Sequence, residues 1–244
     1  MISTYEITLP VLNEEACLER SVRQILTFFN ENNLPHWSLA ITDNGSTDQT
    51  LEIAEQLCSE FPSKIRVISI KTKGVGFAVR ESWVSSKADI VGYMDIDLAT
   101  KLSHLIDVKI LFNTNQEIKI INGARRLHNA EIINQKLIRR FTSVSLNIIL
   151  SIFLNVKFTD AMCGFKFFDR LTVLKLLQET PNIPDWFVCA ELLIRAEWQG
   201  IKVHEIPVIW TDDQVSRVNV IKLSLQYFKH IKRLFFEKWT KHSL

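Results

Sequence analysis

Apolar and polar residues follow two different periods along the first half of the chain. Short apolar runs alternate with longer segments in which apolar residues recur every three or four positions. The short runs are typical of buried strands and the longer segments of amphipathic helices, so the alternation indicates an α/β fold of βα units. Such units form a mostly parallel central sheet with helices on both faces. The predicted strands cover residues 5–9, 38–42, 65–70, 90–94 and 118–121.

Two helices are expected after the first two strands. In residues 14–29 the apolar side chains share one helical face, which predicts a helix packed on the sheet. The next helix is expected to begin at Ser46, because Ser-Thr-Asp-Gln has the spacing of a capping box that ends at Gln49. Strand, loop and helix start therefore follow in the order of a βα unit.

The second half of the chain is less regular. Residues 131–156 have the period of one long helix, which becomes apolar on nearly every side after Arg140, so its surface must be covered. A helix that ends with Gly200 as its C′ residue follows later. The remaining predicted elements are a turn at 162–164, an apolar stretch at 165–168 and a strand at 202–210. No repeat or linker is found, so residues 1–218 are predicted to form one domain.

The tail, residues 219–244, is more basic than this domain. From residue 217 onward the chain has seven Lys or Arg residues against the single acid Glu237. Its apolar residues recur every three or four positions, at Ile221, Leu225, Phe228, Ile231, Phe235 and Trp239. This pattern predicts a basic amphipathic helix at an anionic membrane surface. The alternative is that the apolar stripe packs on the domain or on a second copy of the chain in a homodimer.

Composition limits the class of protein. With 47% hydrophobic and 23% charged residues the chain can build a soluble core, which excludes disordered and fibrous proteins. No apolar run reaches the roughly 18 residues of a spanning helix, and the segment after Met1 lacks the pattern of a signal peptide. The four scattered cysteines have no zinc-site spacing, so we expect reduced thiols in a cytosolic protein.

Two acids follow the predicted strand at residues 90–94. Asp95 and Asp97 are two positions apart, so at a strand end both carboxylates point to one side and can bind one cation. Mg²⁺ and Mn²⁺ prefer oxygen ligands, with phosphate oxygens completing the shell. Because ligands bind at the carboxyl ends of strands in open α/β sheets, the sequence predicts a metal-assisted phosphate site there.

A lysine and two glycines follow the third predicted strand. Glycine is rare, with seven residues in the chain, so Gly74 and Gly76 are expected to have backbone roles. Their N–H groups could approach a phosphate while Lys73 neutralises it. The dinucleotide-binding fingerprint is incomplete, because Val79 stands where its third glycine would be, and no Walker P-loop occurs.

Four motifs carry a family resemblance. In chain order they are Leu9-Pro-Val-Leu-Asn-Glu-Glu15, Asp43-Asn-Gly-Ser-Thr-Asp48, Lys73-Gly-Val-Gly-Phe-Ala78 and Asp95-Ile-Asp97. Together they resemble the inverting family 2 glycosyltransferases of the GT-A fold. The likeness continues through the Asp160-Ala-Met-Cys-Gly164 block and Glu205-Ile-Pro-Val-Ile-Trp210, and it covers roughly residues 4–220. Within the family the chain is similar to the dolichyl-phosphate glucosyltransferases and mannosyltransferases.

The resemblance implies roles for the matching residues. Those implied to hold the donor nucleotide are Pro10, Leu12, Glu14, Asp43, Lys73, Gly74 and Asp95. Asp95 and Asp97 are implied as metal ligands, and the catalytic residues that the resemblance implies are Asp97, Arg125, Arg139, Arg140 and Arg217. Those implied to surround the donor diphosphate and the acceptor phosphate are Arg125, Arg139, Arg140, Ser143, Ser216 and Arg217. The alanine at position 99 resembles the glucosyl enzymes more than the mannosyl enzymes. Val215 stands where the family usually has a glycine before Ser216.

The implied reaction moves a hexose, as glucose from UDP-glucose, onto a polyprenyl phosphate at the cytoplasmic face of a membrane. An acceptor phosphate is already anionic, so it can attack the anomeric carbon without a general base, while Mg²⁺ or Mn²⁺ stabilises the leaving diphosphate. A lipid substrate also favours the membrane interpretation of the tail. No nucleic-acid partner is expected.

Three alternatives stay open. A glycan or other soluble acceptor would need a general base, and Asp185 or Glu191 could serve. A GDP-mannose donor would keep the same chemistry with another sugar. A nucleotide-binding module without catalysis, or a nucleotidyltransferase, would bind nucleotide without sugar transfer, and the intact pair of Asp95 and Asp97 argues against it.

Overall fold

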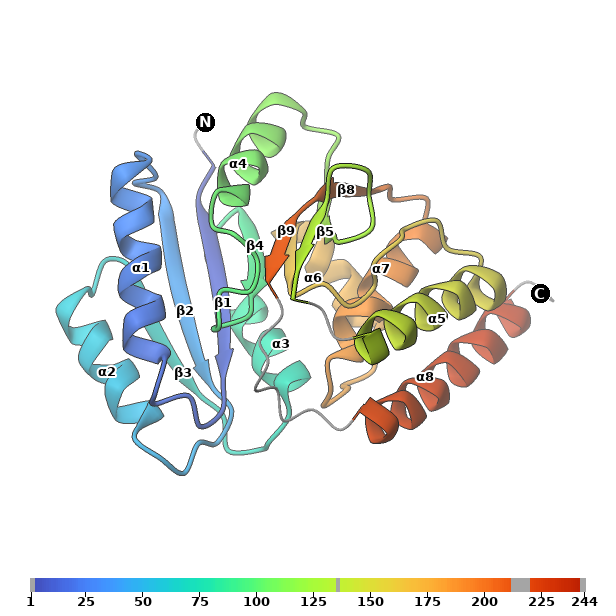
Figure 1. Ribbon diagram of the computed structural model, residues 1–244, viewed down its shortest axis with the longest axis horizontal. Helices are drawn as coiled ribbons and strands as arrows, with labels where there is room; N and C mark the ends of the chain where they lie inside the picture. Colours follow the sequence, from blue (N-terminus) through green and yellow to red (C-terminus); the bar gives the residue numbers. More distant parts are fainter. Residues whose placement is uncertain (1–2, 135–136, 212–219, 242–244) are drawn as a thin grey trace.

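The protein is built around a seven-stranded sheet (Figure 1). The computed structural model describes residues 3–134, 137–211 and 220–241, with the backbone alone for 137–141, 220–225 and 241. The strands of this sheet are β1 Tyr5–Val11, β2 Trp37–Asp43, β3 Ile65–Ser69, β4 Ile90–Met94, β5 Ile120–Ala124, β7 Phe165–Asp169 and β8 Val203–Pro207. Their spatial order is β3-β2-β1-β4-β7-β5-β8, and only β7 runs antiparallel to its neighbours. The predicted mostly parallel α/β sheet is therefore confirmed.

Helices cover both faces of this sheet. Their bounds are α1 Leu18–Glu31, α2 Thr50–Glu60, α3 Val75–Ser85, α4 His104–Thr114, α5 Leu137–Leu154, α6 Arg170–Glu179, α7 Phe187–Trp198 and α8 Val220–Lys241. The apolar residues of α1, α2 and α4 form one core with the sheet. Those of α3, α6 and α7 form a second core, to which α5 and α8 add buried residues. The layers give every strand except those at the edges two covered faces, which is why the strands are apolar runs in the sequence.

Both predicted helix starts are too early. α1 begins at Leu18 rather than at residue 14, and α2 begins at Thr50 rather than at Ser46. The Ser46 hydroxyl does not cap α2, because its Oγ accepts a hydrogen bond from the backbone N–H of Asn13 at 2.9 Å. The polar residues before each helix form hydrogen bonds between the loop after β1 and the loop after β2. The pattern of residues within one segment cannot predict a contact with another segment.

Residues 131–156 do not form one helix. Residues 131–133 form β6 (Glu131–Ile133), which pairs in parallel with β9 (Ile209–Thr211) in a second, two-stranded sheet. The predicted strand at 202–210 is correspondingly two strands in two sheets. The chain leaves the main sheet at Val208. The Val208 side chain is buried, and its carbonyl oxygen accepts a hydrogen bond from the backbone N–H of Glu131. Pairing with a distant partner has therefore overridden the helical period.

The helix predicted to end at Gly200 is α7. It is separated from α6 by a segment with Pro181 and Pro184, and a proline lacks the N–H that a helix needs. Its end is as expected. Gly200 has a positive φ of 77°, and the N–H groups of Gly200 and Ile201 donate to the carbonyls of Glu197 and Ala196, which is the Schellman pattern.

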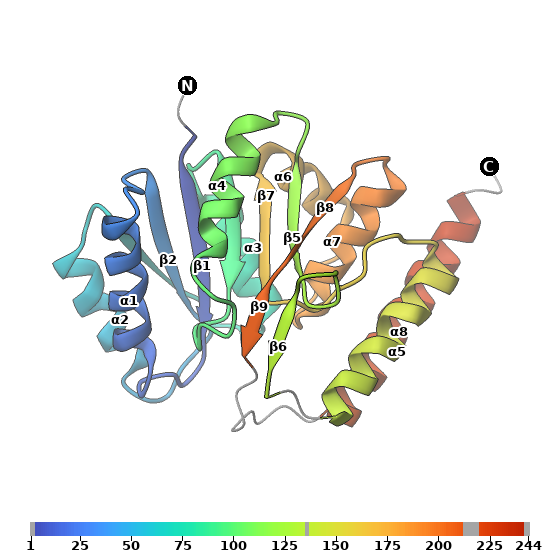
Figure 2. The same cartoon turned by 45° about the horizontal axis from the view of Figure 1, so that its top comes forward.

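The helices α5 and α8 lie side by side at one end of the sheet (Figures 1 and 2). Leu150 and Leu154 of α5 are buried, as are Tyr227, Ile231 and Leu234 of α8. The cover that the apolar sequence of α5 requires thus comes partly from the tail. Within the part of the chain that the structure describes, no helix combines the length and the hydropathy needed to span a membrane.

Candidate functional site

The loops that follow β1 and β2 are joined by hydrogen bonds at the carboxyl edge of the sheet. The backbone N–H of Thr47 donates to Oδ1 of Asn13 at 2.8 Å, which complements the bond from Asn13 to Ser46. Asp43, at the end of β2, accepts from the backbone N–H groups of Gly45 and Ser46, both at 3.2 Å. These bonds form within and between the loops, so the rim of the predicted donor site is held in place before any ligand binds.

The residues predicted to hold the donor nucleotide gather at this rim but differ in exposure. Pro10 and Asp43 are buried at the ends of neighbouring paired strands. Leu12 is 40% exposed, although it follows a buried strand. The Glu14 carboxylate accepts a bond from the Cys17 thiol at 3.3 Å. Leu12 is thus the apolar residue of this group that is open to solvent.

Gly74 and Gly76 do not offer their N–H groups to a phosphate, which corrects that expectation. The N–H of Gly74 donates to Oδ1 of Asn44 at 2.6 Å, and the N–H of Gly76 donates to the carbonyl of Pro184 at 3.0 Å. A Cβ atom on Gly76 would overlap the carbonyl oxygen of Ile183. The glycines therefore let α3 pack closely on the segment before α7. The exposed side chain of the neighbouring lysine, Lys73, passes beside Gly45.

Asp95 and Asp97 lie just beyond β4, as predicted, but in different surroundings. Asp97 is exposed, and its Oδ1 accepts a bond from the Ala99 N–H at 2.9 Å. Asp95 is partly buried against Gly164, where a Cβ atom would overlap its carboxylate. Burial, and secondly the charge of Asp97, raise the pKa of Asp95 to about 7, against the opposing charges of Arg125 and Lys166. The pair is thus an electrostatically unfavourable arrangement that a cation would relieve.

The two acids form a small ligand set. Among the residues that the structure describes, no cluster of three or more His, Cys, Asp and Glu side chains could hold a metal ion. Two carboxylates alone suit Mg²⁺ or Mn²⁺, which usually keep waters and substrate phosphates as their other ligands. The donor set therefore fits a metal that is bound together with a diphosphate.

The turn formed by residues 160–164 lies next to Asp95. The Asp160 carboxylate is fully buried. It accepts hydrogen bonds from Nε and Nη2 of Arg125 at 2.7 and 2.8 Å, and from the backbone N–H of Arg125 at 3.0 Å. Burial acts to raise the pKa of Asp160, but the Arg125 guanidinium holds it below its ordinary value. The same guanidinium lies 4.9 Å from the centre of the Trp210 ring. Arg125, predicted to face the donor diphosphate, is therefore engaged with protein groups on two sides.

Lys166 is fully buried within β7 and was not among the predicted site residues. Its Nζ donates to the carbonyl of Cys163 at 2.6 Å, and the Tyr93 hydroxyl donates to the same oxygen at 3.2 Å. The sequence feature that could have identified Lys166 is its place inside the apolar run Phe165-Lys-Phe-Phe168. A buried charged group is costly unless it is hydrogen-bonded, so a lysine there indicates a specific partner.

The predicted acceptor residues are only partly described. Ser143 lies on α5, and its Oγ is buried without a hydrogen-bond partner among the described residues. Four residues later Asn147 accepts a bond from the Ala161 N–H at 2.9 Å, which brings α5 to the turn beside Asp95. Arg139 and Arg140 are in the first turn of α5, where the backbone alone is described. Ser216 and Arg217 lie outside the described residues.

The two candidate general bases are both bonded to charged or ionisable partners. Glu191 is fully buried, with Nη2 of Arg195 at 2.7 Å and Arg233 on its other oxygen. Asp185 is only partly buried, and its Oδ2 lies 3.1 Å from Nε2 of His230. Glu191 therefore cannot meet an acceptor in this arrangement, whereas Asp185 keeps some exposure.

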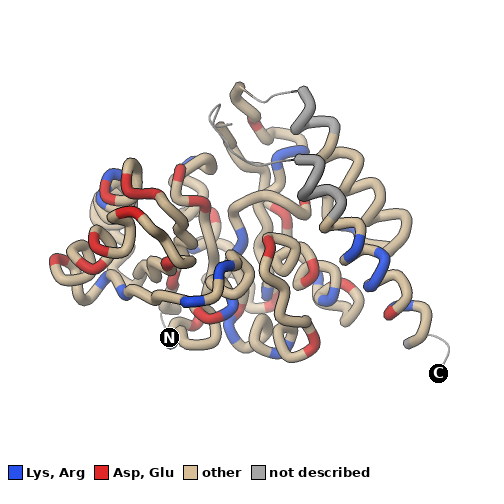
Figure 3. Tube along the Cα trace, turned by 90° about the horizontal axis from the view of Figure 1, so that it is seen from below, with Lys and Arg blue, Asp and Glu red and all other residues tan. Residues whose placement is uncertain are grey.

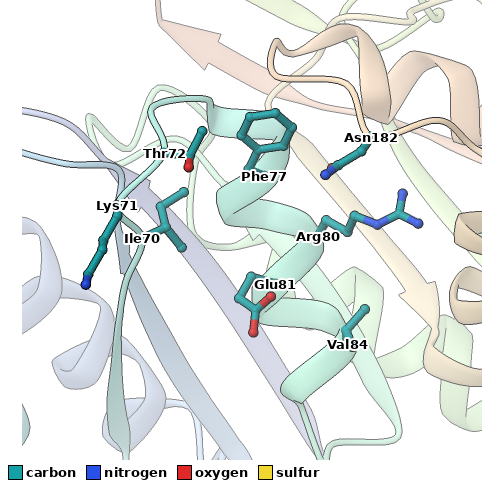
Figure 4. Close-up of a pocket in the computed structure, with 8 residues that line it drawn as sticks. All are labelled: Ile70, Lys71, Thr72, Phe77, Arg80, Glu81, Val84 and Asn182. Carbon is teal, nitrogen blue, oxygen red and sulfur yellow. The ribbon is translucent and has the colours of Figure 1, made fainter.

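Two surface pockets lie beside the rim rather than over the acid pair. One, of about 500 Å³, is formed by α3, the segment after β3 and Asn182, with Phe77 and Arg80 beside it (Figure 4). The Arg80 guanidinium donates to the carbonyls of Leu177 and Thr180, so it holds the end of α6. A larger groove of about 740 Å³ separates α1 from residues 98–103. Neither is lined by Asp95 or Asp97.

Comparisons with known proteins agree with this architecture. The profile of "Glycosyl transferase family 2" matches residues 6–172. Glycosyltransferase AglD of Haloferax volcanii is 27% identical over 95% of this chain, which spans 37% of that protein. The dolichyl-phosphate beta-glucosyltransferase of Saccharomyces cerevisiae is 27% identical over 92% of this chain and 72% of its own length.

A solved structure shows the fold most directly. The glucosyl-3-phosphoglycerate synthase of Mycobacterium tuberculosis, in complex with Mn²⁺, UDP-glucose and phosphoglyceric acid, has a TM-score of 0.69. It is 20% identical, and the alignment covers 96% of this chain and 80% of that one. The likeness establishes a GT-A fold, and the expectation of this fold is confirmed.

Proposed function

Because the chain belongs to glycosyl transferase family 2, we propose that it transfers glucose from UDP-glucose to a polyprenyl phosphate at the cytoplasmic face of a membrane, with inversion at the anomeric carbon. The observation that carries the proposal is the acid pair Asp95 and Asp97 at the rim formed by β1, β2 and β4. The dolichyl-phosphate beta-glucosyltransferase of yeast, similar over most of this chain, supports the choice of sugar and acceptor.

The donor would bind across the loops that follow β1 and β2, which hydrogen bonds join at the rim. Leu12 offers an exposed apolar surface for the base, Asp43 fixes the neighbouring loop, and Lys73 supplies a positive charge. Asp95 and Asp97 would hold Mg²⁺ or Mn²⁺ together with the diphosphate, and the metal would stabilise negative charge on the leaving group. Pro10, Glu14 and Gly74 complete the proposed donor site through the backbone and loop positions that they fix.

The acceptor is proposed to be anionic because the arrangement of acids suits a reaction without a general base. Glu191 is enclosed by two arginines, and Asp185 shares its carboxylate with His230. An acceptor phosphate needs cations rather than a base. We assign this role to Arg139, Arg140 and Arg217, with Ser143 and Ser216 as hydroxyl donors. Arg125 is proposed to act by positioning the turn through Asp160.

The membrane contact is proposed to be a joint surface of α5 and α8. The exposed apolar residues on these helices are Ile148, Ile152 and Phe153 of α5 and Phe228, Phe236 and Trp239 of α8. Figure 3 shows basic positions along α8, of which Lys229 and Lys232 have exposed side chains. Exposed aromatic and apolar residues with flanking lysines are suited to an anionic lipid surface. A homodimer would use the same apolar surface.

The decisive experiment measures donor binding and transfer together. Purified protein is assayed with UDP-glucose and a short polyprenyl phosphate in the presence of Mn²⁺, and calorimetry reports the affinity for UDP-glucose. We expect R139A/R140A to lose transfer by at least about 100-fold while donor affinity stays within about twofold, because a charge-assisted hydrogen bond contributes roughly 1.5–3 kcal/mol.

The control for this variant is K175A, since Lys175 is an exposed cation on α6. Near-normal transfer by R139A/R140A would favour a glycan or other soluble acceptor. A matching fall in donor affinity would place these arginines on the donor diphosphate instead. No transfer from UDP-glucose, with transfer from GDP-mannose, would change the proposed sugar.

The membrane surface is tested by vesicle sedimentation. F228S/W239S should bind anionic vesicles about tenfold more weakly than the unchanged protein, because two interfacial anchors are lost. L171S is the matched control, since Leu171 is equally exposed, at 64%, but lies on α6. Substitution is preferable to removal of the tail, because α8 contributes Ile231 and Leu234 to the core. Unchanged vesicle binding with a changed oligomeric state would identify the surface as a dimer contact.

A further inference from the structure

The proposed function does not explain why two buried side chains, Lys166 and Tyr93, both donate hydrogen bonds to the carbonyl oxygen of Cys163. We call this pair of donors the clamp. Lys166 and Tyr93 face one another across the antiparallel pair of β7 and β4, so their side chains lie on the same side of the sheet. Both reach back to one carbonyl oxygen, at 2.6 Å from the lysine Nζ and 3.2 Å from the tyrosine hydroxyl. Two donors therefore occupy the oxygen that precedes Gly164.

Gly164 is the point at which this turn meets the acid pair. The register that pairs Met94 with Phe165 places Gly164 opposite Asp95, one step beyond the ladder. A side chain at Gly164 would overlap the Asp95 carboxylate, so the carboxylate lies directly against the backbone of the turn. Any rotation of the peptide between Cys163 and Gly164 would move the surface on which Asp95 rests.

We propose that Lys166 and Tyr93 are positioning residues for Asp95, and that they act by fixing the Cys163–Gly164 peptide. The inference rests on the proposed function, because Asp95 is the acid assigned to the metal and the donor. The other end of the turn has separate supports, the pair of Arg125 and Asp160 and the bond from Ala161 to Asn147. Lys166 and Tyr93 thus control the end of the turn that touches the acid.

The chemistry of the lysine is consistent with this role. Lys166 is fully buried, and burial lowers the pKa of its ammonium group. An amine donates an N–H hydrogen bond whether or not it carries the additional proton, so the clamp does not depend on the charge. A buried lysine is costly to keep in an apolar strand between Phe165 and Phe167, and a methionine of similar length would fill the space at lower cost.

The experiment compares K166M, Y93F and the double variant by calorimetry of UDP binding at several Mn²⁺ concentrations, with thermal unfolding on the same samples. We expect each single variant to weaken Mn²⁺-dependent UDP binding, K166M by about tenfold, as for residues that orient a metal ligand. The double variant should lose more than the product of the two single effects, since only then does the carbonyl lose both donors. In the transfer assay the Mn²⁺ concentration for half-maximal rate should rise, while KM for the polyprenyl phosphate stays unchanged.

K175M is the control for loss of a lysine, since Lys175 is exposed on α6. The unfolding temperature of K166M should be equal to or above that of the unchanged protein, which a lysine with a purely structural role would not give. If K166M does not fold, Y93F decides alone, because it removes one hydroxyl and leaves the ring packing. Folded variants that keep the normal Mn²⁺ dependence would overturn the inference, whereas an unchanged protein that binds no UDP with Mn²⁺ would overturn the proposed function.

Discussion

Asp160 and Asp95, the two aspartates beside the turn at residues 160–164, have pKa values shifted in opposite directions. Asp160 is enclosed by the Arg125 guanidinium and by backbone N–H groups, and its pKa lies below the ordinary value. Asp95 is pressed against Gly164 beside another acid, and its pKa is raised to about 7. Its carboxylate makes no hydrogen bond to a described residue. The acid that is bonded to its counter-ion holds the turn together, whereas the acid with the raised pKa has the kind of perturbed carboxylate that is typical of a ligand site.

The largest expected effect concerns the acid pair at the end of β4. D97N should lower the rate of glucose transfer by on the order of 10³-fold, because an amide is a poor substitute for an anionic metal ligand and several kcal/mol of charge stabilisation are lost. Steady-state transfer rates at saturating Mn²⁺ measure it, and urea unfolding should show almost no change. D107N is the control, as Asp107 is an exposed acid on α4. Retention of a tenth of the activity would remove Asp97 from the metal site.

The compensated acid should instead govern stability. D160N leaves the Arg125 guanidinium buried without its carboxylate, and we expect the free energy of unfolding in urea to fall by about 3–5 kcal/mol. E60Q, which breaks the exposed pair of Arg23 and Glu60, should leave the free energy of unfolding almost unchanged, because water screens an exposed pair. Equal costs for the two substitutions would show that burial does not distinguish these pairs.

The pH dependence of D160N sharpens the same contrast. Because the folded pKa of Asp160 lies below that of the unfolded chain, the pair stabilises the protein above the unfolded pKa near 4. This contribution is lost as the pH falls through the lower, folded pKa. The difference in unfolding free energy between the unchanged protein and D160N should therefore shrink below pH 4. A difference that stays constant from pH 7 to pH 3 would contradict the depressed pKa.

The smallest expected effect has the opposite sign. The folded pKa of Asp95, about 7, exceeds the unfolded value, so its contribution to stability is complete below pH 4 and is lost as the pH rises to 7. D95N removes this penalty, so at pH 8 its free energy of unfolding in urea should be higher than that of the unchanged protein by about 1 kcal/mol. The gain should fade between pH 7 and pH 5, while Mn²⁺-dependent UDP binding is lost at every pH. A less stable D95N at pH 8 would indicate that Asp95 is a structural acid.

Local patterns were sufficient for much of the first half of the chain. Residues 5–9, 38–42 and 90–94 lie in strands as predicted, because each is an apolar run in an interior strand of the sheet, whose two faces are covered by helices. The spacing of Asp95 and Asp97 after such a run also placed both acids at the end of β4. In these segments the local preference and the final environment agree, so a single sequence is informative.

Tertiary contacts decided the rest. Residues 131–133 have a helical period but pair with β9, and the loop at Ser46 bonds to Asn13 rather than capping α2. The support beneath Asp95 is also a matter of contacts, since Asp160, Lys166 and Tyr93 are separated from one another or from their partners by many residues. The sequence by itself determined which segments are apolar and which acids end a strand. Only the tertiary structure decided which charges are neutralised, because burial and the distance to a partner depend on residues far apart in the chain.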